Sequence, residues 1–270
     1  MNSELPIGIF DSGIGGLTVA KEIIELMPNE KVIYFGDTLH LPYGEKSNKK
    51  VINYCFKICD FLKEKKCKAI VVACNTASSV AINSIKKKIG KECFVFNVID
   101  PVIEKIKKQK CNTIGIIGTN ATISSKIYEK KINKHNKDIK VFSLATPLLA
   151  PMIESRFHNA SIKKKIIATY LNDQKLNSIE TLILGCTHYP LILSEIEEFY
   201  NNKTHVISSL NSIGFHIKEK LEKNKLLNKT KKRKKHEFFV SDLTTSFQKN
   251  AKSFFTNDII LKEKNIFHEK

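Results

Sequence analysis

The sequence predicts an α/β protein made of two similar halves, each with a mainly parallel sheet. Three observations lead to this prediction. Short apolar segments of strand length alternate with amphipathic segments of helix length. The order of these segments restarts after about residue 112. Two of the apolar segments end in a cysteine, Cys74 or Cys186, directly before a segment expected to be helical.

Length and hydropathy limit the kind of protein. The 270 residues can form one large α/β domain or two of ordinary size. No apolar run is long enough to cross a bilayer, and the first residues lack the basic and then apolar order of a secretory signal. We therefore expect a cytoplasmic protein with no membrane partner.

The net charge of +18 raises the alternative of a basic nucleic-acid-binding protein, which would bind duplexes with a steep salt dependence. The lysines, however, are spread along the whole chain, and arginine occurs only at Arg156 and Arg233. The densest basic run, residues 231–235, lies in a polar connecting segment. This distribution favours solvated helix faces, and we expect no nucleic-acid partner.

The seven cysteines include no C-x-x-C pair, so neither a disulfide framework nor a structural zinc site is expected. Cys55 and Cys59 lie four residues apart in the apolar stripe of a predicted helix, which indicates core positions. Three others, Cys67, Cys93 and Cys111, flank predicted strands and have no polar constellation nearby in the sequence. Cys74 and Cys186 differ, because polar residues follow each of them at once.

In the first half, a strand at residues 7–10 leads into the turn Asp11-Ser12-Gly13-Ile14-Gly15-Gly16 and a helix that Pro28 ends. A glycine-rich turn can hold a dinucleotide, but the third glycine of that motif is missing and Asp11 would repel a pyrophosphate. The second strand, residues 32–35, ends before Asp37, and a loop at 41–44 precedes a helix that Ser47 can cap. The strand ending at Cys74 comes next, and another follows at residues 94–99.

The second half repeats this order. Residues 114–119 resemble 7–12 and are followed by a helix through Ile132, and residues 141–144 resemble 32–35. Residues 147–154 are expected to form a loop in the place of 41–44. The strand before Cys186 matches the strand before Cys74, and an amphipathic helix and a strand at 204–207 complete the half.

The last part of the chain has no counterpart in the repeat. It contains a lysine-rich helix at 212–227, a strand at 237–240 and a further segment at 244–255, which we expect to return to the first half. The predicted fold is therefore two Rossmann-like α/β domains related by a pseudo-two-fold axis. The first contains residues 1–99 and 208–270, the second is inserted at residues 100–207, and the active site lies in the cleft between them.

This symmetry would place Cys74 and Cys186 on opposite sides of one small ligand. Racemisation needs a base on one face of a carbon and an acid on the other, and a thiolate and a thiol can exchange these roles. A cysteine at a helix N-terminus has a lowered pKa, and both cysteines are predicted to have this position.

Other polar residues fall in the same strand-end loops. Asp11, Asp37, Glu154 and His188 could move protons or orient the thiols, whereas Ser12, Asn75, Thr76 and Thr187 offer neutral donors for a substrate carboxylate. For Asn75 and Thr76, simple helix capping is the alternative. Two other kinds of site also remain open: an acyl-transfer cysteine with His188 as base, although the spacing of two residues argues against it, and a zinc site formed by Cys74, Cys186 and His188.

Several segments resemble the signatures of the bacterial glutamate racemase family. They are Asp11 to Thr18, Pro42-Tyr43-Gly44, Ala73-Cys74-Asn75-Thr76-Ala77-Ser78 and Leu184-Gly185-Cys186-Thr187-His188-Tyr189-Pro190. The resemblance covers nearly the whole chain. It implies cofactor-independent interconversion of L- and D-glutamate, with Cys74 and Cys186 as the acid/base pair and D-glutamate supplied for peptidoglycan.

The same resemblance implies substrate contacts at Asp11 and Ser12, Tyr43 and Gly44, Asn75 and Thr76, and Thr187 and His188, with assisting roles for Asp37, Glu154 and His188. It also implies a homodimer, and it implies neither a cofactor nor a metal. The sequence therefore predicts a two-base glutamate racemase. The alternative within the same mechanism is a racemase of another amino acid such as aspartate.

Overall fold

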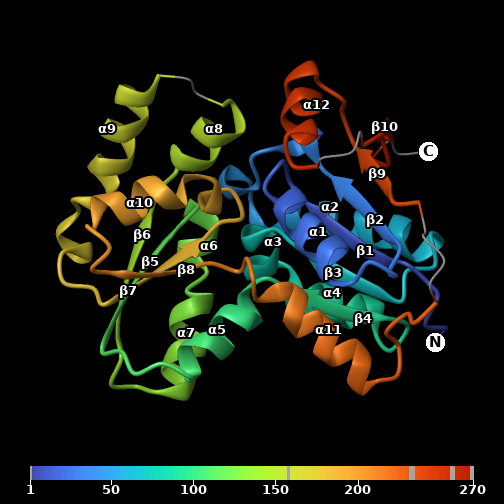
Figure 1. Ribbon diagram of the computed structural model, residues 1–270, viewed down its shortest axis with the longest axis horizontal. Coiled ribbons are helices and arrows are strands. Elements are labelled where there is room, and N and C mark those ends of the chain that lie inside the picture. The colour runs from blue at the N-terminus through green and yellow to red at the C-terminus, as the bar shows by residue number, and fades with distance from the viewer. Residues whose placement is uncertain (1, 157–158, 231–234, 256–258, 268–270) are drawn as a thin grey trace.

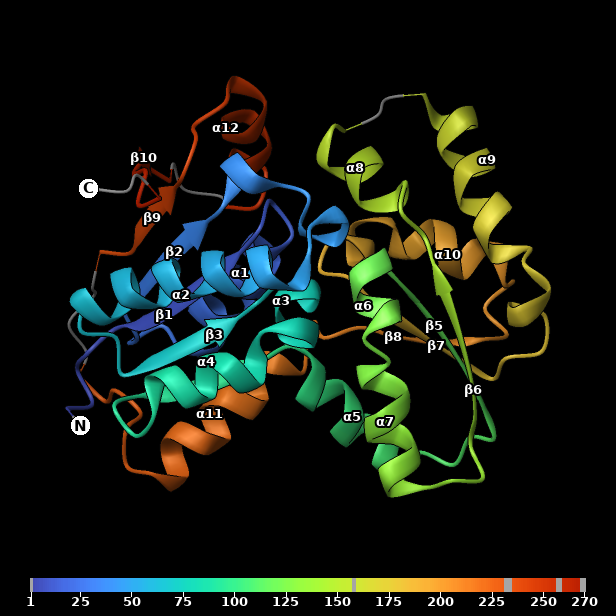
Figure 2. The same cartoon turned by 180° about the vertical axis from the view of Figure 1, so that it is seen from behind.

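The chain folds into two α/β halves that lie side by side (Figures 1 and 2). The computed structural model describes residues 2–156, 159–230, 235–255 and 259–267. The predicted α/β class with two mainly parallel sheets is confirmed. The domain boundaries at residues 99 and 207 stay a prediction.

The first half is built on a sheet of six strands, and all the strand pairs in it are parallel. The chain after residue 236 supplies two of these strands, which pair beside β2, and Figure 1 shows them in red next to the blue strands. The order across the sheet is β10 (Leu261–Glu263), β9 (Glu237–Val240), β2 (Val32–Gly36), β1 (Ile7–Asp11), β3 (Ala69–Val72) and β4 (Phe94–Asn97).

Helices cover both faces of this sheet, because alternate strand residues are apolar on each side. In β1, Ile7 and Ile9 belong to one core and Phe10 to the other. The first face is covered by α1 (Gly16–Leu26), α11 (Ile213–Lys223) and α12 (Thr245–Lys252). The second is covered by α2 (Asn48–Glu64), α3 (Asn75–Val80) and α4 (Ile82–Ile89), and its core contains Cys55 and Cys59 as predicted.

The second half has a parallel sheet of four strands, in the order β6 (Lys140–Ala145), β5 (Thr113–Gly118), β7 (Thr181–Gly185) and β8 (His205–Ile207). One face packs against α8 (Leu149–Glu154), α9 (Ala160–Leu171), the 3-10 helix η4 (Tyr189–Ile192) and α10 (Leu193–Phe199). The other face packs against α5 (Ile99–Lys107) and α7 (Ile127–His135). Shorter elements are η1 (Thr38–His40), η2 (Tyr43–Glu45), α6 (Asn120–Ser124) and η3 (Gln174–Leu176).

The two sheets share one topology. The order β2-β1-β3-β4 in the first sheet corresponds to β6-β5-β7-β8 in the second. The repeat inferred from the sequence is therefore present in the strand order. As a result, β3 and β7, which precede the two cysteines, occupy equivalent places in their sheets.

Four local expectations were wrong. Residues 147–154 were expected to be a loop but contain α8, in which Pro151 is tolerated because it lies in the first turn. The helix after Cys74 is divided into α3 and α4 at Ala81. The helix after β5 is likewise divided, because Lys126 has a left-handed backbone with φ 54°. The strand at 94–99 ends at Asn97, whose side-chain oxygen accepts from the N–H groups of residues 99 and 100.

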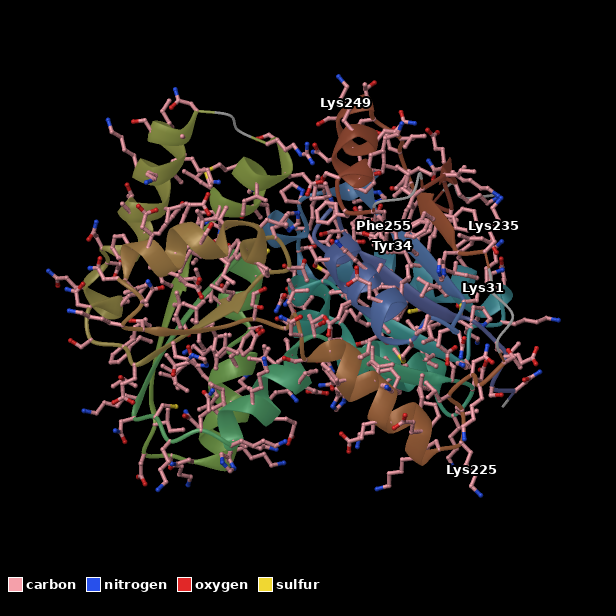
Figure 3. The ribbon with its side chains drawn as sticks, viewed as in Figure 1. Lys31, Tyr34, Lys225, Lys235, Lys249 and Phe255 are labelled. Atoms are coloured by element: carbon pink, nitrogen blue, oxygen red, sulfur yellow. The ribbon has the colours of Figure 1, made fainter. Side chains whose placement is uncertain are left out.

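Four labelled lysines lie at the periphery of the first half: Figure 3 shows Lys31 and Lys235 near each other and Lys225 and Lys249 away from them. Most of the basic run at residues 231–235 lies outside the described residues. Within the described part of the chain, no helix is both long and apolar enough to span a membrane.

Candidate active site

A cavity of about 300 Å³ lies at the carboxyl ends of the strands of both sheets, which is where open parallel sheets bind ligands. Both halves line it. The first half contributes Ser12, Leu41, Pro42, Tyr43, Gly44, Cys74, Asn75, Thr76 and Ser246, and the second contributes Thr119, Ala150, Pro151, Glu154, Ser155, Cys186, Thr187 and His188.

Cys74 follows β3 and is the N-cap of α3. Its sulfur accepts from the backbone N–H of Ala77 at 3.5 Å and lies 3.7 Å from Oγ of Ser12. The expected lowering of its pKa was wrong. Burial, together with the charge of Asp11, raises the pKa of Cys74 to about 12 and outweighs the two hydrogen bonds.

Cys186 has a different environment from the one predicted. The residues after it form no α-helical turn, and η4 begins only at Tyr189. Instead, the Cys186 sulfur lies 3.6 Å from Nδ1 of His188, so the short spacing does not prevent this contact. Nε2 of the same ring contacts the carboxylate of Glu154, which ends α8. A carboxylate, an imidazole and a thiol thus lie in series along one wall of the cavity.

The surroundings of His188 favour its charged form. Burial opposes its charged form, but the Glu154 carboxylate and the Cys186 sulfur outweigh burial and raise the pKa of His188 well above its usual range. An imidazolium in contact with a cysteine is a partner that stabilises a thiolate. The surroundings of the two cysteines therefore differ: Cys186 contacts the His188 imidazole, whereas Cys74 contacts neutral groups and lies near the Asp11 carboxylate.

The glycine-rich turn after β1 brings the second half close to the first. A Cβ on Gly15 would lie 2.6 Å from Oγ1 of Thr187, so a larger residue would push back the segment that carries Cys186. The N–H of Ile14 donates to the Glu154 carboxylate at 3.2 Å. The turn thus serves close packing between the halves, which explains its glycines without a dinucleotide.

Asp11 does not line the cavity, although the sequence placed it in the site. It is fully buried, and Oδ2 accepts from the N–H groups of Gly13 and Gly16 at 3.0 and 2.9 Å. Burial raises its pKa, in opposition to His188 and these two hydrogen bonds. Oγ1 of Thr187 donates to Oδ1 at 3.4 Å. Asp11 therefore holds the turn and one cavity-lining residue in place.

Asp37 also lies behind the cavity wall. Its buried carboxylate accepts from the Tyr43 hydroxyl at 2.5 Å and from Oγ of Ser241 at 2.9 Å. Tyr43 and Gly44 line the cavity, and Gly44 lies so close to Thr119 that a Cβ there would be 2.6 Å from the Cβ of Thr119. Asp37 thus positions Tyr43 and holds the tail of the chain.

Asn75 and Thr76 do not cap α3; both line the cavity and bond to the second half. Nδ2 of Asn75 donates to the Tyr128 hydroxyl at 2.7 Å, and Oγ1 of Thr76 lies 2.9 Å from Oγ1 of Thr119. The sequence prediction of the site omitted Thr119, yet the repeat contained the signal, since Thr119 follows β5 as Ser12 follows β1. Ser246 carried no such signal.

The site can place a thiol and a thiolate around one small molecule, with hydroxyl and amide groups to bind it. The volume is near the lower end of the usual range for small-molecule sites, roughly 300–1,000 Å³. Among the described residues, no three or more His, Cys, Asp or Glu side chains are grouped as ligands for a metal ion. The zinc alternative thus has no support in the described ligand geometry.

Comparison with known proteins agrees with this geometry. The model of the Asp/Glu/hydantoin racemase family matches residues 14–212. The chain is 40% identical to a glutamate racemase of a Thermoanaerobacter species over 266 residues, which is 97% of this chain and 96% of the relative.

Solved structures give the same result. A glutamate racemase of Francisella tularensis in complex with D-glutamate superposes with a TM-score of 0.90 at 35% identity, covering 98% of this chain and 99% of that one. A glutamate racemase isoform of Bacillus anthracis has a TM-score of 0.92 at 35% identity, with 97% and 98% covered. The chain therefore belongs to the Asp/Glu/hydantoin racemase family and is an amino-acid racemase, an isomerase.

Proposed function

We propose that this protein is a glutamate racemase that interconverts L- and D-glutamate without a cofactor, by a two-base mechanism with Cys74 and Cys186. One observation carries the proposal. The two cysteines end equivalent strands of two sheets with the same topology, and both line one cavity. Two acid/base groups of the same kind at such related positions suit the inversion of a single carbon.

The chemical step balances without an external reagent. One cysteine thiolate takes the α-proton of the substrate and becomes a thiol, while the carbon holds the electron pair as a carbanion. The other thiol gives its proton to the opposite face of that carbon and becomes a thiolate. The product is the other enantiomer, and the enzyme is left ready for the reverse reaction.

The surroundings of the two sulfurs differ. His188, whose raised pKa favours its charged form, lies 3.6 Å from the Cys186 sulfur. Burial, followed by the charge of Asp11, raises the pKa of Cys74, which keeps it a thiol and a proton donor. We therefore propose that His188 and Glu154 assist proton transfer at Cys186.

Neutral groups would bind the substrate carboxylates. The described cavity-lining residues include no lysine or arginine, but they offer hydroxyl and amide donors at Ser12, Asn75, Thr76, Thr119 and Thr187. A Cys186-His188-Glu154 series also resembles an acyl-transfer triad. The presence of Cys74 in the same cavity and the family favour racemisation.

Glutamate as the substrate is supported by the relatives, which are named glutamate racemases, and by the Francisella protein bound to D-glutamate. We further propose that the D-glutamate serves peptidoglycan synthesis in the cytoplasm. The requirement for two reduced thiols supports this location, since the cytosol keeps thiols reduced. The family resemblance also supports a homodimer, which a molar mass near 31 kDa in solution, that of one chain, would contradict.

Single alanine substitutions of the two cysteines test the proposal. In a polarimetric assay with L-glutamate and chelator present, Cys74→Ala and Cys186→Ala should each lose at least about 100-fold in racemisation rate. Cys93→Ala, at a buried cysteine outside the cavity, is the matched control and should stay active. Near-normal turnover in either active-site variant would exclude the mechanism. Faster turnover of L-aspartate than of L-glutamate would identify aspartate, and not glutamate, as the substrate.

A further inference from the structure

A hydrogen bond joins the two halves beside the cavity. The hydroxyl of Tyr128, on α7 of the second half, accepts from Nδ2 of Asn75, on α3 of the first half, at 2.7 Å. Both side chains are only 3% exposed. Of the two, only Asn75 lines the cavity. Tyr128 therefore acts behind the wall, on a residue that a ligand can reach.

The other end of the Asn75 amide has no hydrogen-bond partner among the residues that the structure describes. Oδ1 of Asn75 is buried and accepts no hydrogen bond from the described part of the chain. A buried acceptor without a partner costs roughly 1–3 kcal/mol, so such groups are rare and call for an explanation. Because the amide lines the cavity, a bound molecule can supply the donor. An amino-acid substrate carries an ammonium group with three N–H donors.

Tyr128 is a rigid support for this amide. Its ring belongs to the apolar core between α7 and the second sheet, with Ile116, Ile132 and Ile183. Burial raises the pKa of the Tyr128 phenol, so the hydroxyl stays neutral and available for hydrogen bonding. A buried tyrosine normally places its hydroxyl against a partner, and here the partner is Asn75 of the other half.

We infer that Tyr128 is a positioning residue for substrate binding, which holds the plane of the Asn75 amide so that its free end faces the bound amino acid. This inference rests on the proposed function, since it takes the cavity to be the glutamate site. Without the hydroxyl, the amide can rotate away, and the site loses order that the ligand must then restore. The effect belongs to binding, so it should be seen in KM more than in kcat.

A double-mutant cycle tests the inference. Tyr128→Phe keeps the ring and removes only the hydroxyl, and it should raise KM for glutamate about tenfold, the effect of about 1.4 kcal/mol, with kcat changed less than about threefold. In the Asn75→Ala background, Tyr128→Phe should change KM less than about twofold, because the amide that the Tyr128 hydroxyl holds is absent. If Asn75→Ala is too slow for kinetics, the dissociation constant for glutamate from calorimetry replaces KM.

Tyr200→Phe is the matched control, because the Tyr200 hydroxyl is buried in the same half without a hydrogen-bond partner among the described residues. It should leave KM unchanged. Urea unfolding of all variants separates loss of stability from loss of binding. An unchanged KM in Tyr128→Phe, a fall in kcat alone, or an equal rise in KM in both backgrounds would overturn the inference. A wild-type protein that turns over no glutamate would instead contradict the proposed function, and the inference with it.

Discussion

Glu154→Gln is the most informative single substitution, because it changes a charge and little else. Glu154 and His188 are 15% and 4% exposed in their side chains, and they form a carboxylate–imidazole pair. Two unit charges about 4 Å apart interact with about 4 kcal/mol at an effective dielectric constant of 20. Removing that interaction leaves burial, which opposes the imidazolium, as the largest influence on His188.

The expected result is a loss of activity that depends on pH. Because the pKa of His188 is raised in the wild type, the imidazolium persists as pH rises above about 6.5 and is lost only through the higher folded-state value. In Glu154→Gln this alkaline limb of kcat/KM should move to lower pH. At pH 8, kcat/KM should fall about 100- to 1,000-fold, because an interaction of about 4 kcal/mol allows a loss of up to about 1,000-fold.

Isotope effects show which half of the reaction is affected. The equilibrium constant between enantiomers is 1, so kcat/KM must fall equally in both directions. Proton abstraction by Cys186, however, should become more rate-limiting than abstraction by Cys74. The primary isotope effect with α-deuterated glutamate should therefore rise for one enantiomer only.

A matched control is Glu195→Gln, which removes a carboxylate paired with Lys163 outside the cavity in the same half. It should leave the pH profile unchanged. The reasoning is refuted if Glu154→Gln keeps the wild-type alkaline limb, or if the isotope effects of both enantiomers rise together.

Two further substitutions test the packing beside the site and a buried ion pair at the amino end of the first sheet. Gly15→Ala would place a Cβ 2.6 Å from Oγ1 of Thr187 and so displace the segment that carries Cys186. This should lower kcat/KM about 100-fold, the effect of a misplacement of about 1 Å. Unchanged kinetics would contradict this expectation, because they would show that the segment moves without cost. Lys68→Met would leave the fully buried Glu30 carboxylate without its ion pair and should cost about 3–5 kcal/mol of unfolding free energy in urea. Part of the lost unfolding free energy should return in the double variant Lys68→Met with Glu30→Leu. An unchanged unfolding free energy in Lys68→Met would contradict the role of Lys68 as the partner of the Glu30 carboxylate.

The sequence predicted most of the strands and the two cysteine positions because both depend on local pattern. A buried parallel strand is a short apolar run, and polar residues directly after it mark the edge where ligands bind. The repeat added the correspondence of β3 with β7. Helix boundaries were predicted less well, since the left-handed Lys126 and the cap by Asn97 are decided by local side chains and packing.

The chemical state of the site was decided only by tertiary structure. Local sequence predicted a lowered pKa for Cys74 from its place before a helix, yet burial in the assembled core raises that pKa. Glu154 and His188 are 34 positions apart and Tyr128 and Asn75 are 53 apart, so their contacts have no pattern in the sequence. The sequence by itself determined two thiols at equivalent strand ends. Tertiary structure made them unlike, because desolvation and the contact with a paired imidazole depend on which groups the fold packs beside each sulfur.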